Sequence, residues 1–302
     1  MPRLLRFAVV GHPVKQSASP AMHAAAFKAL GMPHTYEAVE CPGVAPLKAA
    51  VGLMRKGGIA GLNVTIPHKR AVLELVDEID PSAESIGAAN TLVRTDAGAV
   101  RALNTDVPAL VEELSELSPR IGSAVIIGAG GAASAALAAC QKLGVRVIGM
   151  TSRSWSSSEA MYDGEVPTGF RERGALTLLW PGVEVDEGAS SKMSHALRLQ
   201  WLDIAASADI VIQAASASAG EAAARVIPWD RISPTAVALD VVYVPRDTPF
   251  LRAARARGLR AEGGAGMLVR QGALAFEAWL GQRPPLDVLR RAVDAHVAAL
   301  PT

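Results

Sequence analysis

The chain contains little cysteine, no excess of either charge and no long hydrophobic run. Its two cysteines, Cys41 and Cys140, lie far apart and do not have the spacing of metal ligands. This pattern excludes a disulfide framework and argues against a zinc site, so we expect no metal. It also favours the reducing cytoplasm as the location of the protein.

The charges balance, because 30 Lys and Arg residues face 29 Asp and Glu residues. A balanced chain offers no reason to expect nucleic acid or an anionic membrane as a partner. We expect a protein that acts on or binds a small molecule, as a monomer or homodimer.

Hydrophobic residues are abundant but dispersed, and no apolar stretch approaches the roughly 20 residues of a membrane-spanning helix. The first apolar run ends at Gly11 and Pro13, which makes it too short for the core of a signal peptide. We interpret this run as the first buried strand.

Short β-branched runs alternate with stretches rich in Ala and Leu along the first hundred residues. Such alternation is typical of βαβ units and a largely parallel sheet. The pattern predicts strands at 6–11, 34–40 and 61–66, with helices at 19–31, 45–57 and directly after residue 66.

A second series of the same kind begins near residue 123 and ends in a strand at 236–244. The chain is therefore predicted to form two α/β domains with a cleft between them. Residues 154–206 are rich in Ser, Gly and charge, and we interpret part of them as an insertion or a mobile surface loop. The tail predicts two helices, which we expect to pack on the first domain.

The stretch VIIGAGGAASAAL combines an apolar strand, a glycine turn and an Ala-rich helix. Its spacing G-x-G-x-x-A is that of a dinucleotide-binding loop, in which the pyrophosphate lies on the helix N-terminus. The alternative is a tight turn in an ordinary α/β fold. The candidate cofactor residues in this loop are Gly128, Gly130, Gly131, Ala132 and Ala133.

The strand that follows this helix should end in an Asp or Glu if the cofactor were NAD. The chain offers Ser152, Arg153 and Ser154 there instead. Arg153 could pair with the 2′-phosphate of NADP through its planar guanidinium group, so NADP is favoured and NAD stays possible. The alternative is that Arg153 ends a strand and faces water.

Several segments together resemble the shikimate dehydrogenase family. They occur in the family's order between Gly11 and Trp279, and they are GHPVKQSASPAMH, GLNVTIPHK, IGAANTLV, LNTD, VIIGAGGAA, LDVVYVPRDTP and GGAGMLVRQGALAFEAW. The resemblance implies reversible, NADPH-dependent reduction of 3-dehydroshikimate to shikimate, a step of aromatic amino-acid (chorismate) biosynthesis.

The resemblance also assigns the domains. Residues 1–106, with C-terminal helices at about 271–302, correspond to the substrate-binding and catalytic domain. Residues 107–270 correspond to a Rossmann-type domain that binds NADP.

Lys69 and Asp106 match the catalytic pair of the family. Reduction of a ketone leaves alkoxide charge on oxygen, and a cationic lysine beside a carboxylate can stabilise that charge and supply a proton path. Which of the two carries the proton is left open. Without the other motifs, Lys69 would be interpreted as a surface cation.

The remaining assignments also come from the resemblance. Ser17 and Ser19, with Tyr243, match the residues that hold the substrate carboxylate. Thr65, Asn90, Asp106 and Gln271 match those that contact the ring hydroxyls, and Asn63 is a second-line candidate that orders the loop backbone. Gly264 and Met267 match positions against the nicotinamide.

The chain departs from the family at two places beside the predicted pocket. Gln16 stands where His is frequent, and His68 stands where Phe is usual, so either residue could shift substrate preference. The segment 107–109 lacks the usual glycines, which predicts a stiffer connection to the second domain.

Other departures cluster in the nucleotide-binding part. The segment Ser152–Ser154 replaces the usual Asn-Arg-Thr, and Ser157 stands where a second basic residue is expected. Residues 213–220 replace a usual Asn-Ala-Thr run. These departures bear on the choice of cofactor and leave the catalytic pair intact. A quinate or aminoshikimate dehydrogenase using NAD is an alternative, and a non-catalytic shikimate sensor is a lesser one.

Overall fold

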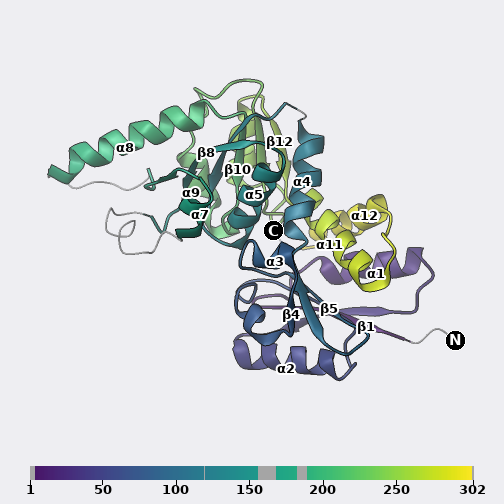
Figure 1. Ribbon diagram of the computed structural model, residues 1–302. Coiled ribbons are helices and arrows are strands. Elements are labelled where there is room, and N and C mark those ends of the chain that lie inside the picture. Colours follow the sequence, from purple (N-terminus) through teal and green to yellow (C-terminus); the bar gives the residue numbers. More distant parts are fainter. Residues whose placement is uncertain (1–3, 119, 156–167, 182–188, 301–302) are drawn as a thin grey trace. The chain divides into compact units, whose positions relative to one another are not determined.

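The computed structural model describes residues 4–118, 120–155, 168–181 and 189–300 (Figure 1). The chain divides into two compact units, Met1–Ala109 with Ala265–Thr302, and Leu110–Gly264, which we call unit 1 and unit 2. The sequence predicts the corresponding limits after residue 106 and at about residue 271. The functional assignment of the two domains stays a prediction.

Unit 1 is built on a six-stranded sheet in the order β2-β1-β3-β5-β6-β4. Strand β1 pairs in parallel with β2 and β3, whereas β5 runs antiparallel to both β3 and β6. The strands are β1 (Arg6–Gly11), β2 (Thr35–Glu40), β3 (Gly61–Val64), β4 (Glu78–Ile79), β5 (Thr91–Arg94) and β6 (Val100–Leu103).

The sheet is thus mixed, and the antiparallel position of β5 differs from the expected largely parallel arrangement. Strands β5 and β6 are joined by a tight turn, in which Gly98 has φ +87° and its N–H donates to the Thr95 carbonyl oxygen at 2.9 Å. A connection this short can join only antiparallel neighbours, because a parallel crossover needs a dozen residues or more.

Both faces of this sheet are covered. On one face Ala8 and Val10 of β1 share a core with Leu47 of helix α2, and on the other Phe7 contacts Trp279 with ring centroids 5.0 Å apart. Figure 1 shows α1, α11 and α12 lying together, so the C-terminal helices belong to unit 1. The helices are α1 (Ser19–Ala29), α2 (Val44–Arg55), α3 (Pro81–Glu84), α11 (Ala265–Leu280) and α12 (Leu286–Ala298), and α4 (Asp106–Leu117) begins in this unit.

The sequence predicts an α-helix directly after residue 66. The structure has a 3₁₀ helix there instead, η1 (Ala71–Leu75). Val76 is extended and leads directly into β4, which pairs with β6. Too few residues separate the Pro67 loop from this strand for a stable α-helix, since helix nucleation is costly.

Unit 2 contains a six-stranded sheet in the order β12-β11-β10-β7-β8-β9, and all of its pairings are parallel. This is the strand order of a Rossmann fold, with the switch point at β7. The strands are β7 (Ser123–Ile127), β8 (Arg146–Thr151), β9 (Thr177–Leu178), β10 (Ile210–Gln213), β11 (Val237–Asp240) and β12 (Arg260–Gly263).

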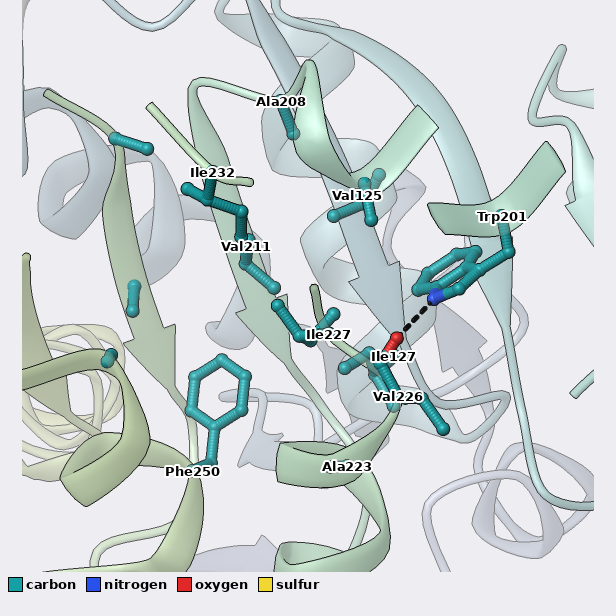
Figure 2. Packing of buried hydrophobic residues seen from close by; sticks show 14 of the residues in the cluster. Val125, Ile127, Trp201, Ala208, Val211, Ala223, Val226, Ile227, Ile232 and Phe250 are labelled. Carbon is teal, nitrogen blue, oxygen red and sulfur yellow. Dashed lines mark hydrogen bonds between the residues drawn. The ribbon is translucent and has the colours of Figure 1, made fainter. Parts of the chain in front are cut away.

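The core of unit 2 joins the sheet to its helices (Figure 2). Val125, Ile127 and Val211 of the sheet share this core with Phe250 of helix α10, while the fully buried Trp201 of α8 donates to the Val226 carbonyl oxygen at 2.7 Å. The helices are α5 (Gly131–Lys142), α7 (Thr168–Glu172), α8 (Ala189–Ala206), η2 (Ala217–Ala219), α9 (Gly220–Arg225) and α10 (Pro249–Ala256).

Part of the segment 154–206 is therefore regular structure, because α7, β9 and α8 lie within it. The remainder of the predicted insertion or loop falls on residues 156–167 and 182–188, which lie outside the described residues.

Candidate active site

The candidate catalytic residues Lys69 and Asp106 lie in contact within unit 1. Lys69 follows β3, Asp106 is the first residue of α4, and the Lys69 Nζ lies 2.7 Å from the Asp106 Oδ2. The Lys69 side chain is 22% exposed and that of Asp106 only 5%. The Lys69 side chain is thus partly exposed to solvent, while the Asp106 carboxylate is buried.

Asn90 holds the other oxygen of this carboxylate. Its side-chain amide donates to the Asp106 Oδ1 at 2.8 Å and to the Thr105 Oγ1 at 2.9 Å. The Asn90 Oδ1 accepts from the Thr105 backbone N–H at 2.8 Å. The Gln271 Oε1 is 3.4 Å from the same amide nitrogen, so helix α11 brings Gln271 to this cluster.

Thr65 directly follows β3 and is partly buried. It packs so closely against Gly11 that any side chain at Gly11 would collide with the Thr65 methyl group. The His12 N–H donates to the Ile66 carbonyl oxygen at 2.9 Å. Sequence reasoning did not single out Gly11 as a site residue, although it opens the motif that contains Ser17.

Ser17 lies on the loop between β1 and α1, Ser19 is the first residue of α1, and the Ser19 N–H donates to the Ser17 Oγ at 3.2 Å. Glu40 anchors this loop, because its carboxylate accepts from the Val14 N–H at 2.8 Å and lies 2.7 Å from the His12 Nδ1. The hydrogen bonds from Val14 and His12 lower the pKa of Glu40.

Asn63 is only 6% exposed, and its polar atoms are used inside the unit. Its Oδ1 accepts from the Tyr36 hydroxyl at 2.7 Å, and its amide donates to the Asn90 carbonyl oxygen at 3.1 Å and to the Thr91 Oγ1 at 3.2 Å. Asn63 therefore ties β2, β3 and β5 together.

The two departures from the family in unit 1 occupy different environments. His68 is 3% exposed, and its Nε2 lies 2.5 Å from the Cys41 carbonyl oxygen. The ring thus forms a buried hydrogen bond with the backbone of another segment. Gln16 is exposed on the serine loop. The segment 107–109 forms the first turn of α4, where a proline is tolerated because its missing N–H has no partner there.

In unit 2 the glycine loop connects β7 to α5 at the switch point of the sheet. Gly128 has φ +130°, and a Cβ at this residue would lie 2.8 Å from the carbonyl group of Ala214. Gly130 caps α5 with extended backbone, while Ala133 is fully buried behind the loop. The loop therefore leaves the α5 N-terminus open, which fits a pyrophosphate.

The three residues after β8 form a compact turn. The Ser152 and Ser154 hydroxyl oxygens are 3.0 Å apart, Arg153 is exposed, and the Trp155 N–H donates to the Ser152 carbonyl oxygen at 2.9 Å. Two hydroxyls and a guanidinium group fit a phosphate ester. The substituted position Ser157 lies outside the described residues.

The remaining candidates are divided between the units. Tyr243 and Gly264 belong to unit 2, where Tyr243 is partly buried and the Gly264 N–H donates to the Val242 carbonyl oxygen at 3.0 Å. Met267 lies on α11 in unit 1 and is 8% exposed. Residues 213–220 end β10 and form η2.

Asp240 fixes the backbone that leads to Tyr243. Its carboxylate accepts from the Val242 N–H at 2.9 Å and from the Thr248 hydroxyl at 2.6 Å. Burial raises the pKa of Asp240 from 3.8 to about 6, although both hydrogen bonds lower it. Sequence reasoning missed this anchor, which is the last residue of the apolar strand β11.

The raised pKa predicts a pH-dependent contribution to stability. The folded chain keeps a proton on Asp240 that the unfolded chain has lost, so the contribution is fully present below pH 3.8 and disappears as the pH rises through about 6. Relative to Asp240→Asn, which does not titrate, wild-type protein should lose up to about 3 kcal/mol of unfolding free energy between pH 4 and pH 7.

This prediction is measured by urea unfolding of both proteins at several pH values, followed by tryptophan fluorescence. The signal reports mainly on unit 2, which carries Trp155, Trp180, Trp201 and Trp229. Other titrating groups cancel in the difference between the two proteins. If the difference in unfolding free energy between the two proteins stayed constant from pH 4 to pH 7, the raised pKa of Asp240 would be contradicted.

Within the described residues, no helix has the length and apolar character needed to cross a membrane. No three His, Cys, Asp or Glu side chains of the described part gather as a metal site would require.

Comparison with known proteins bears on this arrangement. Residues 9–92 match the shikimate dehydrogenase substrate binding domain, and residues 264–293 match the shikimate 5′-dehydrogenase C-terminal domain. The NADP(+) shikimate dehydrogenase of Methanopyrus kandleri is 37% identical over 294 residues, which cover 96% of this chain and 94% of that protein. The chain belongs to the shikimate dehydrogenase family. The family assignment made from the sequence motifs is thus confirmed.

Solved members of the family share the fold. The shikimate 5-dehydrogenase of Thermus thermophilus, in complex with NADP(H) and shikimate, is 30% identical with a TM-score of 0.78, covering 97% of this chain and 100% of that one. The quinate dehydrogenase of Corynebacterium glutamicum, in complex with NAD, is 27% identical with a TM-score of 0.78, covering 97% and 99%. The predicted class of two α/β domains is confirmed.

Proposed function

We propose that this protein catalyses the reversible, NADPH-dependent reduction of 3-dehydroshikimate to shikimate in aromatic amino-acid biosynthesis. The observation that carries the proposal is the Lys69–Asp106 pair, with 2.7 Å between nitrogen and oxygen, in a chain that belongs to the shikimate dehydrogenase family. A binding protein would not need a positioned acid and base.

The geometry favours Lys69 as the proton donor. Both carboxylate oxygens of Asp106 are engaged, one by Lys69 and one by Asn90, whereas a lysine ammonium group has three hydrogens. Lys69 therefore has hydrogens left to stabilise the developing alkoxide and to protonate it. Asp106 orients the ammonium group, and in the reverse direction Lys69 in its neutral form accepts the hydroxyl proton.

The substrate contacts are part of the proposal. Ser17 and Ser19 bind the carboxylate, helped by Tyr243, while Thr65, Asn90 and Gln271 bind the ring hydroxyls. Support comes from the family motifs that contain these residues and from the close grouping of Asn90, Gln271 and Asp106. Directional donors and acceptors suit a polyol acid better than an apolar pocket would.

The cofactor residues follow from the fit of unit 2 to a dinucleotide. The glycine loop and the α5 N-terminus bind the pyrophosphate, and Ser152, Arg153 and Ser154 bind the 2′-phosphate. When bound, NADPH supplies the hydride that the protein's side chains cannot provide. Gly264 and Met267 are proposed to contact the nicotinamide.

The experiment is to measure nicotinamide reduction by the purified protein with shikimate and with quinate, each offered NADP and NAD. We expect activity with shikimate and NADP to exceed the other three combinations. Shikimate binding without turnover in any combination would contradict the proposal and indicate a sensor.

One observation favours a second function, oxidation of quinate with NAD. The quinate dehydrogenase of Corynebacterium glutamicum in complex with NAD matches the structure with a TM-score of 0.78, and only Arg153 supplies positive charge in the turn after β8. Higher kcat/KM for quinate and NAD in the same experiment would establish this alternative.

The location and the assembly stay predictions. Both cysteines, Cys41 and Cys140, are free and buried, as a reducing cytoplasm would allow. A monomer or a homodimer is expected.

A further inference from the structure

Asn104 is a buried polar residue close in sequence to Asp106 of the catalytic pair. It lies two residues before Asp106 and is 3% exposed. Its backbone N–H donates to the Ser82 Oγ at 3.0 Å, and both ends of its side chain are also hydrogen-bonded.

The side-chain oxygen of Asn104 caps helix α4. It accepts from the Asp106 N–H at 3.0 Å and from the Val107 N–H at 3.2 Å. This is the pattern of an N-cap, which satisfies N–H groups that have no partner within the helix. The cap fixes the backbone of Asp106 at the start of α4.

The side-chain amide of Asn104 reaches the loop that carries Asn90. It donates to the Ala88 carbonyl oxygen at 2.9 Å. The N–H of the same peptide group, that of Ala89, donates to the Lys69 carbonyl oxygen at 2.8 Å. One buried peptide group thus joins the backbone of Lys69 to the side chain that caps Asp106.

We propose that Asn104 is a positioning residue, which sets the separation of Lys69 and Asp106 through the Ala88–Ala89 peptide group. The two catalytic residues are 37 positions apart in sequence, so their separation depends on contacts between distant segments. Asn104 provides such a contact, because its side-chain oxygen accepts from the Asp106 N–H and its amide donates to the peptide group whose N–H binds the Lys69 carbonyl oxygen. The inference rests on the proposed function, because it concerns the same pair.

The test separates two roles of the Asn104 side chain. Its oxygen caps α4, which we call the cap, and its amide donates to the Ala88 carbonyl oxygen, which we call the bridge. In Asn104→Ser the hydroxyl still caps α4, since serine is a good N-cap, but no amide reaches Ala88. We expect a Tm between those of wild type and Asn104→Ala, because the buried Ala88 carbonyl oxygen loses its donor, together with a fall in kcat of about 10- to 100-fold and an unchanged KM for NADP. Asn104→Ala loses cap and bridge together, so both its Tm and its kcat should fall.

Val51→Ala is the control for loss of stability, because Val51 is a buried apolar residue of α2 whose side chain takes no part in the hydrogen bonds of this network. It should lower Tm and leave kcat per folded molecule unchanged. Wild-type kcat in Asn104→Ser would overturn the proposal, as would an Asn104→Ala enzyme that behaves like Val51→Ala.

A crystal structure of Asn104→Ser provides a readout that does not depend on activity. We expect Asp106 to move away from Lys69, and a pair that keeps its 2.7 Å separation would overturn the proposal. Failure of the wild-type enzyme to oxidise shikimate would contradict the proposed function alone, and this structure would then decide whether Asn104 positions the pair.

Discussion

Replacement of Lys69 by alanine is expected to lower kcat for shikimate oxidation by about 10²- to 10⁴-fold while shikimate still binds. The change removes the ammonium group that lies 2.7 Å from Asp106 and leaves the oxygen of the substrate without a proton donor. Steady-state rates with saturating NADP and shikimate, together with calorimetric binding of shikimate, measure the two effects separately.

Two further substitutions sharpen this prediction. Lys69→Arg keeps a positive charge, but an arginine does not give up its proton in proteins, so turnover should stay low if Lys69 transfers the proton. Lys48→Ala removes an exposed lysine from α2 and should leave kcat unchanged. Turnover by Lys69→Ala at the wild-type rate would refute the assigned chemistry.

Replacement of Arg153 by serine is expected to raise the KM for NADP by about 10- to 100-fold and to leave the KM for NAD almost unchanged. A hydrogen bond to a charged group contributes about 1.5–3 kcal/mol, and each 1.4 kcal/mol corresponds to a factor of ten. NAD lacks the 2′-phosphate, so its binding should not depend on the Arg153 guanidinium group. Initial rates over a range of each cofactor give the ratio.

Arg146→Ser is the matched control, because Arg146 is also exposed and lies at the opposite end of β8. Its substitution should change neither KM. If Arg153→Ser reduced the use of NADP and NAD equally, Arg153 would stabilise the turn between Ser152 and Trp155 and would not select the phosphate.

Much of the fold could be predicted from periodicity. The helices at α1, α2, α11 and α12 and the strand before the glycine loop were expected close to where they lie, because their apolar spacing is strong. Strand β5 and helix η1 were not assigned correctly. The four-residue strand β5 is set by the turn at Gly98 and by its pairing with β6. The 3₁₀ helix η1 is limited by strand β4, which follows it closely and also pairs with β6. Local pattern does not reveal either pairing.

Some residues of the candidate site could be predicted from the sequence and others could not. Lys69, Asp106 and Asn90 could be chosen because their motifs resemble those of a family, and the structure brings these three together. Asn104 and Asp240 were missed. An Asn just before a helix is a capping signal that could have indicated Asn104, but the bond from its amide to Ala88 has no sequence signal.

The sequence by itself determined the α/β class, the glycine loop and the family, because these depend on local spacing and on motifs that occur in a set order. Only the tertiary structure decided which polar groups are paired. The contacts of Lys69, Asn90 and Asn104 join segments far apart in the chain, and a buried hydrogen bond depends on distances that the packing of strands and helices sets.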